Sequence, residues 1–371
     1  MATTYHAEHV GSMLRPPELL EARRARGGDG VGEERLRELE DRAVLDALEL
    51  QREAGIQVFT DGEMRRDTWM AAAYEALDGV ERHPGRMPTW HRDRGDDPPT
   101  AETDIEHYAA TGKLGQRVSL THVEAAYLAD HAPGPYKVTM MSSAMGAILW
   151  QRGASERAYP TPMDLLTDLV ALQATEIEGL VRQGATWIQL DSLVYNQVID
   201  DRFREETGPP IPPEVILDSG IRIDSQLIAA ARRADPDVTV GMHFCRGNNR
   251  SAWMSEGGYE PIAERLFGEV DVDRFLLEYD TERAGGFEPL RFVPAGKTVV
   301  LGLVSTKFPR LEDQDTLRRR IDEASRYVAL EDLALSPQCG FASTSAGNLL
   351  TVDDERRKLE LVVDTARKVW G

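Results

Sequence analysis

A repeated alternation of short apolar segments with amphipathic helical segments is the feature that most constrains the fold of this chain. The apolar segments have the length of buried strands, and the segments between them carry apolar residues at helical spacing. Alternating strands and helices build parallel sheets, so about eight such units predict an α/β fold of the (β/α)8 TIM-barrel type. The expected strands lie near residues 7–10, 56–59, 136–141, 187–190, 238–245, 275–278, 298–303 and 333–335. The expected helices cover residues 36–55, 71–77, 164–184, 216–234, 259–266, 315–328 and 353–369.

An open, doubly wound sheet is the alternative fold for the same alternation. That fold commonly opens its first helix with a Gly-x-Gly-x-x-Gly turn, which this chain lacks. The polar candidates instead follow several different strands, which is typical of a barrel with its site at the carboxyl ends of the strands. We therefore expect one catalytic barrel domain over residues 1–371. Proline, glycine and charged residues interrupt the pattern near residues 83–115, and we interpret this region as an inserted loop, either a lid or a solvated excursion.

The composition argues against several classes of partner. The formal net charge is −20, so phosphate backbones and anionic membranes would be repelled over most of the surface, and we expect no nucleic-acid and no membrane partner. The start of the chain has no signal-peptide pattern, which favours a cytoplasmic protein. With only 2 cysteines, metal binding or catalysis in a reducing compartment is favoured over a disulfide framework. The oligomeric state stays open, a homo-oligomer included.

A candidate metal site begins with His243 and Cys245, two residues apart at the end of an expected strand. Side chains at this spacing point to the same face of a strand, and imidazole nitrogen and thiolate sulfur are both zinc ligands. Alone, such a pair is more often a buried histidine beside a buried thiol, because a metal site needs three or four ligands. Two further candidates follow later strands: Glu278 ends an apolar run, and Cys339, the only other cysteine, follows another.

These residues, in this order, resemble the zinc-binding constellation of the cobalamin-independent methionine synthase catalytic domain. The resemblance implies that Zn²⁺ is held by His243, Cys245, Glu278 and Cys339. It covers nearly the whole chain, and the most similar pattern is the short single-domain branch that also contains epoxyalkane:coenzyme M transferase. Besides the metal motif, it is carried by His9-Val-Gly-Ser12, Thr60-Asp-Gly-Glu63, Ile188-Gln-Leu-Asp191, Cys245-Arg-Gly-Asn248, Leu277-Glu-Tyr-Asp280 and Ser336-Pro-Gln-Cys-Gly-Phe-Ala-Ser343.

The activity that this resemblance implies is zinc-dependent transfer of a methyl or alkyl group to a thiol, most nearly the methylation of homocysteine to methionine. The thiolate is the reactive form of sulfur, and binding to zinc displaces its proton. Glu278 would then be a fourth ligand that the substrate sulfur displaces. The expected partners are a homocysteine-like thiol and a methyl or alkyl donor.

The thiol substrate is expected to meet polar residues from three segments. Glu63 and Asp191, the expected catalytic residues, could pair with the ammonium of homocysteine, while the Ser12 hydroxyl and nearby amides could face its carboxylate. The alternative is that these residues have only structural roles in turns and at strand ends. The complete expected substrate-binding set is His9, Gly11, Ser12, Arg15, Glu63 and Asp191.

Two departures from the family pattern concern the donor. The folate-dependent enzymes carry an Asn-Trp-Ser stretch after the third strand and a histidine after the seventh, where this chain reads Met141-Ser-Ser143 and Leu303-Val-Ser-Thr306. The donor is therefore left unidentified, and a folate donor is not expected. Two other functions stay open: addition of a coenzyme M-like thiol to an epoxide, and a non-catalytic zinc-bearing protein that binds a partner.

Overall fold

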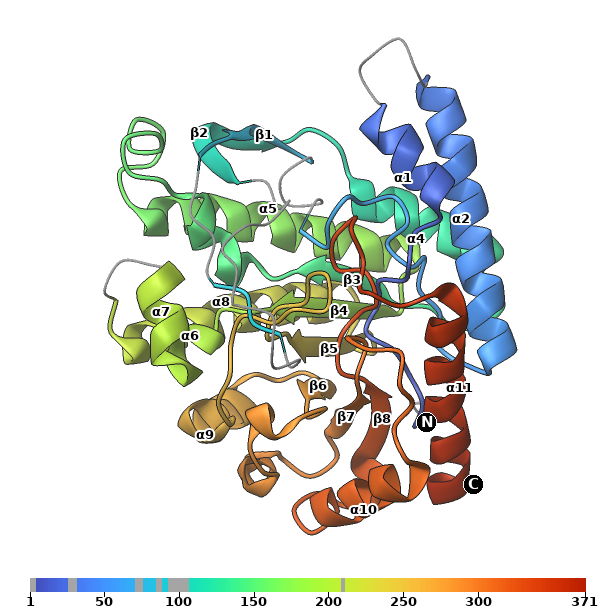
Figure 1. The fold of residues 1–371 in the computed structure, drawn as a ribbon. Coiled ribbons are helices and arrows are strands. Elements are labelled where there is room, and N and C mark those ends of the chain that lie inside the picture. The colour runs from blue at the N-terminus through green and yellow to red at the C-terminus, as the bar shows by residue number, and fades with distance from the viewer. Residues whose placement is uncertain (1–4, 26–31, 71–75, 85–88, 93–106, 208–210) are drawn as a thin grey trace.

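The structure is a computed structural model that describes residues 5–25, 32–70, 76–84, 89–92, 107–207 and 211–371 (Figure 1). Its centre is a parallel six-stranded sheet in the order β3-β4-β5-β6-β7-β8. The runs that form it are apolar and almost wholly buried, as expected for parallel strands covered on both faces. The strands are β3 (Val138–Met141), β4 (Trp187–Ser192), β5 (Thr239–Phe244), β6 (Arg274–Glu278), β7 (Thr298–Val304) and β8 (Leu333–Pro337).

Two N-terminal segments lie at the two edges of this sheet. Ala7 makes a parallel bridge to Leu335 of β8, and Phe59 makes a parallel bridge to Tyr136, just before β3. The order of neighbours is then that of eight strands around a barrel, and the predicted TIM-barrel fold is confirmed. These first two segments are nevertheless not regular strands, because each contributes a single bridge where a strand was expected.

Side chains join the two N-terminal segments. The Thr60 hydroxyl donates to the Gly11 carbonyl at 2.9 Å. Gln51, fully buried on helix α2 (Glu33–Ala54), accepts from the Thr60 amide at 2.9 Å and donates to the Thr60 carbonyl at 3.0 Å. Its Oε1 also lies 2.9 Å from His9 Nε2. Backbone groups that a neighbouring strand would normally pair are therefore satisfied by one amide side chain.

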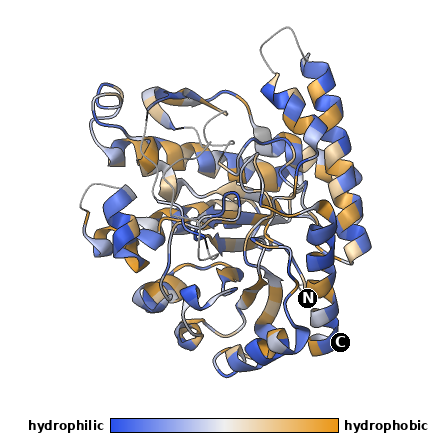
Figure 2. Cartoon of the chain, viewed as in Figure 1, coloured by the Kyte–Doolittle hydropathy of each residue, from blue (hydrophilic) through white to orange (hydrophobic). Residues whose placement is uncertain are grey.

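Helices surround the sheet, and most were predicted from apolar periodicity. Along them hydrophobic and hydrophilic residues alternate (Figure 2). The ends follow capping chemistry: Thr161 and Asp164 form a capping box at the start of α5, and Gly184 ends it in the left-handed conformation. The helices are α1 (Pro17–Arg24), α2 (Glu33–Ala54), α4 (Leu120–His131), α5 (Pro162–Gln183), α6 (Asn196–Ile199), α7 (Asp201–Thr207), α8 (Pro213–Ala234), α9 (Glu260–Glu269), α10 (Gln314–Ala324) and α11 (Val352–Trp370).

The structure differs from the sequence prediction mainly between residues 71 and 131. Strands β1 (Leu77–Arg82) and β2 (Tyr108–Gln116) pair antiparallel beside the barrel, so residues 108–115 of the expected loop are a strand. Glycine and threonine interrupt the apolar alternation of β2, so its sequence does not predict a strand. Helix α4 was not predicted. Residues 71–75 of the expected 71–77 helix lie outside the described residues, as do 85–88 and 93–106 of the expected insertion.

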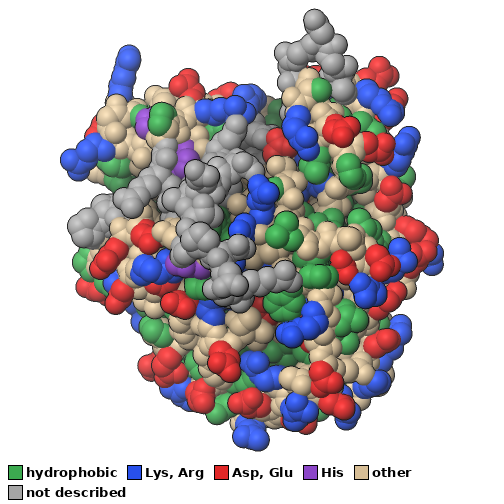
Figure 3. All heavy atoms as spheres, viewed as in Figure 1, with side chains coloured by type: hydrophobic (Ala, Val, Ile, Leu, Met, Phe, Trp, Pro, Cys, Tyr) green, Lys and Arg blue, Asp and Glu red, His purple; other side chains and the backbone are tan. Residues whose placement is uncertain are grey.

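The surface carries charges of both signs. Acidic and basic side chains are interspersed over the face drawn in Figure 3. Within the described residues, each helix is too short or too polar to span a lipid bilayer.

Candidate metal and thiol site

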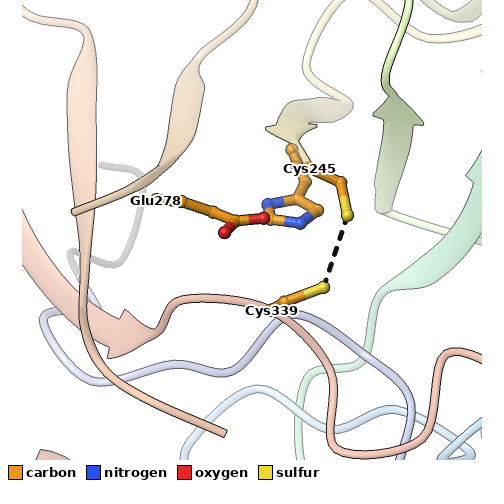
Figure 4. Close-up of side chains that lie close together, drawn as sticks. Cys245, Glu278 and Cys339 are labelled. Carbon is orange, nitrogen blue, oxygen red and sulfur yellow. Dashed lines mark hydrogen bonds between the residues drawn. The ribbon is translucent and has the colours of Figure 1, made fainter. Parts of the chain in front are cut away.

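Four potential metal ligands meet at the carboxyl ends of three barrel strands. His243 lies in β5 and Cys245 directly after it, Glu278 is the last residue of β6, and Cys339 follows β8. One ligand atom from each lies within 4.8 Å of those of the other three, and all four side chains are buried. The labelled side chains of Cys245, Glu278 and Cys339 converge in Figure 4, where the two sulfurs are 3.6 Å apart.

The cluster offers unused donor atoms to a cation. Neither ring nitrogen of His243 has a hydrogen-bond partner among the described residues, and the same holds for Glu278 Oε2. Burial alone would lower the pKa of His243, but its contact with Cys339 and the charges of Asp191 and Glu278 raise that pKa to about 9. The hydrogen bond from Cys245 lowers the pKa of Cys339. Buried nitrogen and oxygen atoms that lack hydrogen-bond partners, close to two thiols and a carboxylate, are suited to bind a divalent cation.

A cavity of about 330 Å³ opens beside His243, Cys245 and Cys339. Its lining is polar on one side and apolar on the other. The described lining contains the carboxylates of Glu63 and Asp191 and no lysine or arginine. The polar side includes Ser12, Glu63, Asp191, Asn248, Ser343 and Thr344, and the apolar side includes Trp69, Trp90, Met145, Leu193, Phe203 and Met254.

Glu63 and Asp191 reach the cavity from different segments. Glu63 has a positive φ of 58°, which is rare for a residue with a side chain, and its amide is held by Asp61 Oδ1 at 3.0 Å. Its Oε1 accepts from the Thr139 hydroxyl at 3.0 Å, and its Oε2 has no partner among the described residues. Asp191 accepts from Gln189 at 2.8 Å. Burial raises the pKa of both carboxyls, that of Asp191 to about 7, so each would gain from a cationic partner.

Of the other predicted substrate-binding residues, some line or adjoin the cavity and others do not. Ser12 lines the cavity. Gly11 lies against Glu63, because a Cβ added there would be 3.1 Å from Glu63 Oε1. His9 contacts Gln51, and burial lowers its pKa to about 3, so it is a neutral buried histidine. Arg15 is also buried and donates to backbone carbonyls, among them that of Glu63 at 3.1 Å. His9 and Arg15 are absent from the cavity lining.

Sequence reasoning missed the apolar side of the cavity. Cys245 and Cys339 pack in one buried cluster with Trp90, Leu193 and Phe203. These side chains come from segments far apart in the chain, and single tryptophans between polar residues carry no periodic signal. Lys307, which lies in the loop after β7, was also not predicted as a site residue.

Comparison with known proteins agrees with this arrangement. The chain matches the family described as "Cobalamin-independent synthase, Catalytic domain" over residues 1–368, and it belongs to that family. The uncharacterized protein YxjH of Bacillus subtilis is 35% identical over an alignment of 378 positions, which covers 99% of this chain and 95% of that protein. A methionine synthase of Pyrococcus abyssi is 24% identical, with 89% of this chain and 84% of that protein covered.

Solved structures give the same result. The putative vitamin-B12 independent methionine synthase of Listeria monocytogenes superposes with a TM-score of 0.74 at 28% identity, covering 100% of this chain and 99% of that one. A B12-independent methionine synthase of Shewanella, solved in complex with selenomethionine, shares the fold at a TM-score of 0.73 and 20% identity, with 99% and 98% covered. The resemblance found in the sequence is confirmed, and with it membership of a family of enzymes that includes methionine synthases.

Proposed function

We propose that this chain is a zinc-dependent methyltransferase that methylates the sulfur of homocysteine, with residues 1–371 forming one catalytic barrel domain. The observation that carries this proposal is the ligand cluster: one imidazole, two thiols and one carboxylate whose donor atoms lie within 4.8 Å of one another beside a cavity. Nitrogen and sulfur ligands of this kind suit zinc better than magnesium or calcium. A buried pair of thiols without a cavity would support only a structural site.

His243, Cys245, Glu278 and Cys339 would hold the zinc, which would supply a Lewis acid that keeps the substrate sulfur deprotonated at neutral pH. The chain's own residues then position the two substrates. Glu278 would be the one carboxylate of the ligand set, and its Oε1 accepts a bond from the Arg246 amide at 2.7 Å, so this residue would keep a partner if the substrate sulfur took its place.

The polar side of the cavity fits the amino-acid end of homocysteine. Glu63 and Asp191 would accept hydrogen bonds from its ammonium, and the raised pKa of each buried carboxyl means that binding this cation also fixes the ionised form. Ser12 would donate to the substrate carboxylate. Arg15 would act indirectly, by holding the backbone at Glu63.

The apolar side fits the group that is transferred. A methyl carbon between Trp90, Leu193 and Phe203 would be shielded from water, and the thiolate would attack it in line while the donor leaves with the bonding electron pair. Thiols with an anionic tail, such as coenzyme M, are disfavoured, because the described lining offers two carboxylates and no lysine or arginine to a sulfonate.

Metal analysis together with thiol binding tests the proposal. Protein purified without chelators should contain about one zinc per chain, the stoichiometry of a single mononuclear site. Homocysteine should shift the zinc X-ray absorption edge toward sulfur ligation, and coenzyme M should do so less. Protein that binds no zinc, or zinc protein that ignores homocysteine, would contradict the proposal; preference for coenzyme M would favour the epoxide reaction.

A further inference from the structure

The loop after β7 contains a buried lysine with no hydrogen-bond partner. Lys307 is 4% exposed, and its Nζ has no acceptor among the described residues. Other buried lysines of the chain are paired: Lys137 Nζ lies 2.9 Å from Glu8, and Lys358 Nζ lies 3.1 Å from Glu312. Burying an unpaired ammonium is costly, so a lysine kept in this state needs a compensating role.

The loop is fixed against the segment that carries Cys339. The amide of Thr306, the residue before the lysine, donates to Gln338 Oε1 at 2.7 Å, and its hydroxyl donates to the Gly340 carbonyl at 3.0 Å. These two acceptors lie on either side of Cys339. Asn348 also donates to the Thr306 carbonyl at 2.8 Å. The position of Lys307 is therefore set relative to the metal cluster by bonds to both neighbours of one ligand.

Glu278 lies on the adjacent strand. It pairs in register with Gly302 of β7, where β6, β7 and the chain after β8 approach so closely that a Cβ on Gly302 would be 2.8 Å from the Leu277 carbonyl and 2.7 Å from Gln338 Cα. One carboxylate oxygen of Glu278 is bound by the Arg246 amide, and the other, Oε2, is unpartnered among the described residues. Burial raises the pKa of Glu278, and the ammonium of Lys307 is the largest influence that opposes it. An unpaired carboxylate oxygen and an unpaired ammonium thus follow neighbouring strands.

The charge of the cluster changes when a thiol binds. Two thiolates and one carboxylate around a divalent cation would leave one negative charge, and a substrate thiolate would add a second among buried side chains. The Arg246 guanidinium, whose nitrogens also lack a hydrogen-bond partner among the described residues, lies over the Tyr259 ring at 4.5 Å, and this contact stabilises part of its charge.

We propose that Lys307 is a positioning residue that pairs with the Glu278 carboxylate when the substrate thiolate replaces it on the metal. The Arg246 amide holds Oε1, and Oε2, which has no partner among the described residues, would accept a bond from the lysine. Lys307 thereby favours the thiol-bound form of the site without touching the substrate. This inference rests on the proposed zinc and thiol function.

Cobalt(II) is the probe for this inference, since its visible spectrum reports thiolate ligands and the coordination number without any turnover. Lys307→Met removes the charge at nearly constant volume, Lys307→Arg keeps it, and Lys297→Met is the control, a lysine just before β7, at the opposite end of that strand, whose partner Asp271 is exposed. All variants are loaded with cobalt(II) and titrated with homocysteine. We expect Lys307→Met to bind cobalt but to need about tenfold more homocysteine, since a charge-assisted bond is lost. Lys307→Arg should recover most of the affinity, and the control should match the wild type.

Two results would overturn the inference. One is a Lys307→Met protein whose homocysteine titration equals that of the wild type; the other is an equal loss from Lys307→Met in a Glu278→Gln background, where no carboxylate remains to be paired. If Lys307→Met does not fold, the double variant Lys307→Met with Glu278→Gln, which removes both charges, should fold; its failure would make Lys307 structural. A wild-type protein that binds no cobalt or ignores homocysteine would instead contradict the proposed function.

Discussion

The two halves of the site are held by different parts of the barrel. The metal half lies at the ends of β5, β6 and β8, whose backbones are fixed by a continuous parallel ladder. Apart from Asp191, which lies in β4, the thiol half depends on residues 11–12 and 61–63, which belong to segments with one bridge each and are held by the side chains of Gln51, Arg15 and Asp61. The proposed metal ligands are thus part of the regular sheet framework, whereas most of the proposed substrate contacts depend on a few side-chain bonds and could be lost separately.

Removal of one cysteine sulfur should have the largest effect of the predicted changes, a loss of metal affinity. Cys339→Ser removes a soft ligand from a four-ligand set, and we expect metal affinity to fall by more than about 100-fold. Competition with a chromogenic chelator measures this. Ser343→Ala is the control, because its hydroxyl lies 3.7 Å from the Cys339 sulfur but is not in the cluster. Equal metal retention in the two variants would remove Cys339 from the ligand set.

The choice of methyl donor should have the next largest effect, on the rate of homocysteine methylation. A tertiary amine such as methyltetrahydrofolate must be protonated as it leaves, and neither Val304 nor Ser305 can supply that proton. We expect an activated donor, such as a sulfonium or a methyl corrinoid, to support at least about 100-fold faster homocysteine methylation than methyltetrahydrofolate, in line with the usual worth of general acid catalysis. Turnover at equal donor concentrations is the measurement, and efficient use of the folate would show that another residue provides the acid.

The thiol half should be the less stable half. Gln51→Leu leaves the Thr60 amide, the Thr60 carbonyl and His9 without their partner, and we expect the free energy of unfolding to fall by about 2 kcal/mol. Gln183→Leu is the matched control, an exposed glutamine with one bond of 3.3 Å, and should change stability little. Urea denaturation compares the two. If Gln51→Leu is as stable as its control, the barrel closes without this side chain.

A single carboxylate should show the smallest and most selective effect. Asp191→Asn should weaken homocysteine binding about tenfold, the worth of one bond to a charged group, while leaving metal content unchanged. A thiol without the amine should bind both proteins alike. Asp224→Asn controls for loss of a buried carboxyl, since Asp224 contacts Ser142 and Tyr195 and does not line the cavity. Equal losses for both thiols would show that Asp191 does not meet the ammonium.

The sequence predicted more of the metal half than of the thiol half, for physical reasons. His243, Cys245, Glu278 and Cys339 follow long apolar runs, and parallel strands bring their carboxyl ends together, so their convergence could be inferred. The segments near residues 7–10 and 56–59 have the same apolar character but only one bridge each. Nothing in their sequence shows that Gln51, on a helix, takes the place of a neighbouring strand.

Lys307 and the apolar side of the cavity were not predictable. A lysine two residues before a proline in a loop resembles a solvated residue, and only the bonds of Thr306 to both neighbours of Cys339 place it beside the cluster. Arg15 shows the reverse case: it was expected to bind substrate, and the structure has it donating to backbone carbonyls instead. Its effect on substrate binding stays a prediction.

The close approach of Gly340 to Ser12 limits how this site can change during evolution. A Cβ at position 340 would lie 1.9 Å from the Ser12 hydroxyl oxygen and 3.2 Å from the Ser12 amide nitrogen, so even alanine would push the substrate-facing segment away. Substitution of Gly340, next to the proposed metal ligand Cys339, is therefore disfavoured. We therefore expect new substrate preferences within this scaffold to arise from changes in the apolar lining of the cavity, which includes Trp90, Phe203 and Met254.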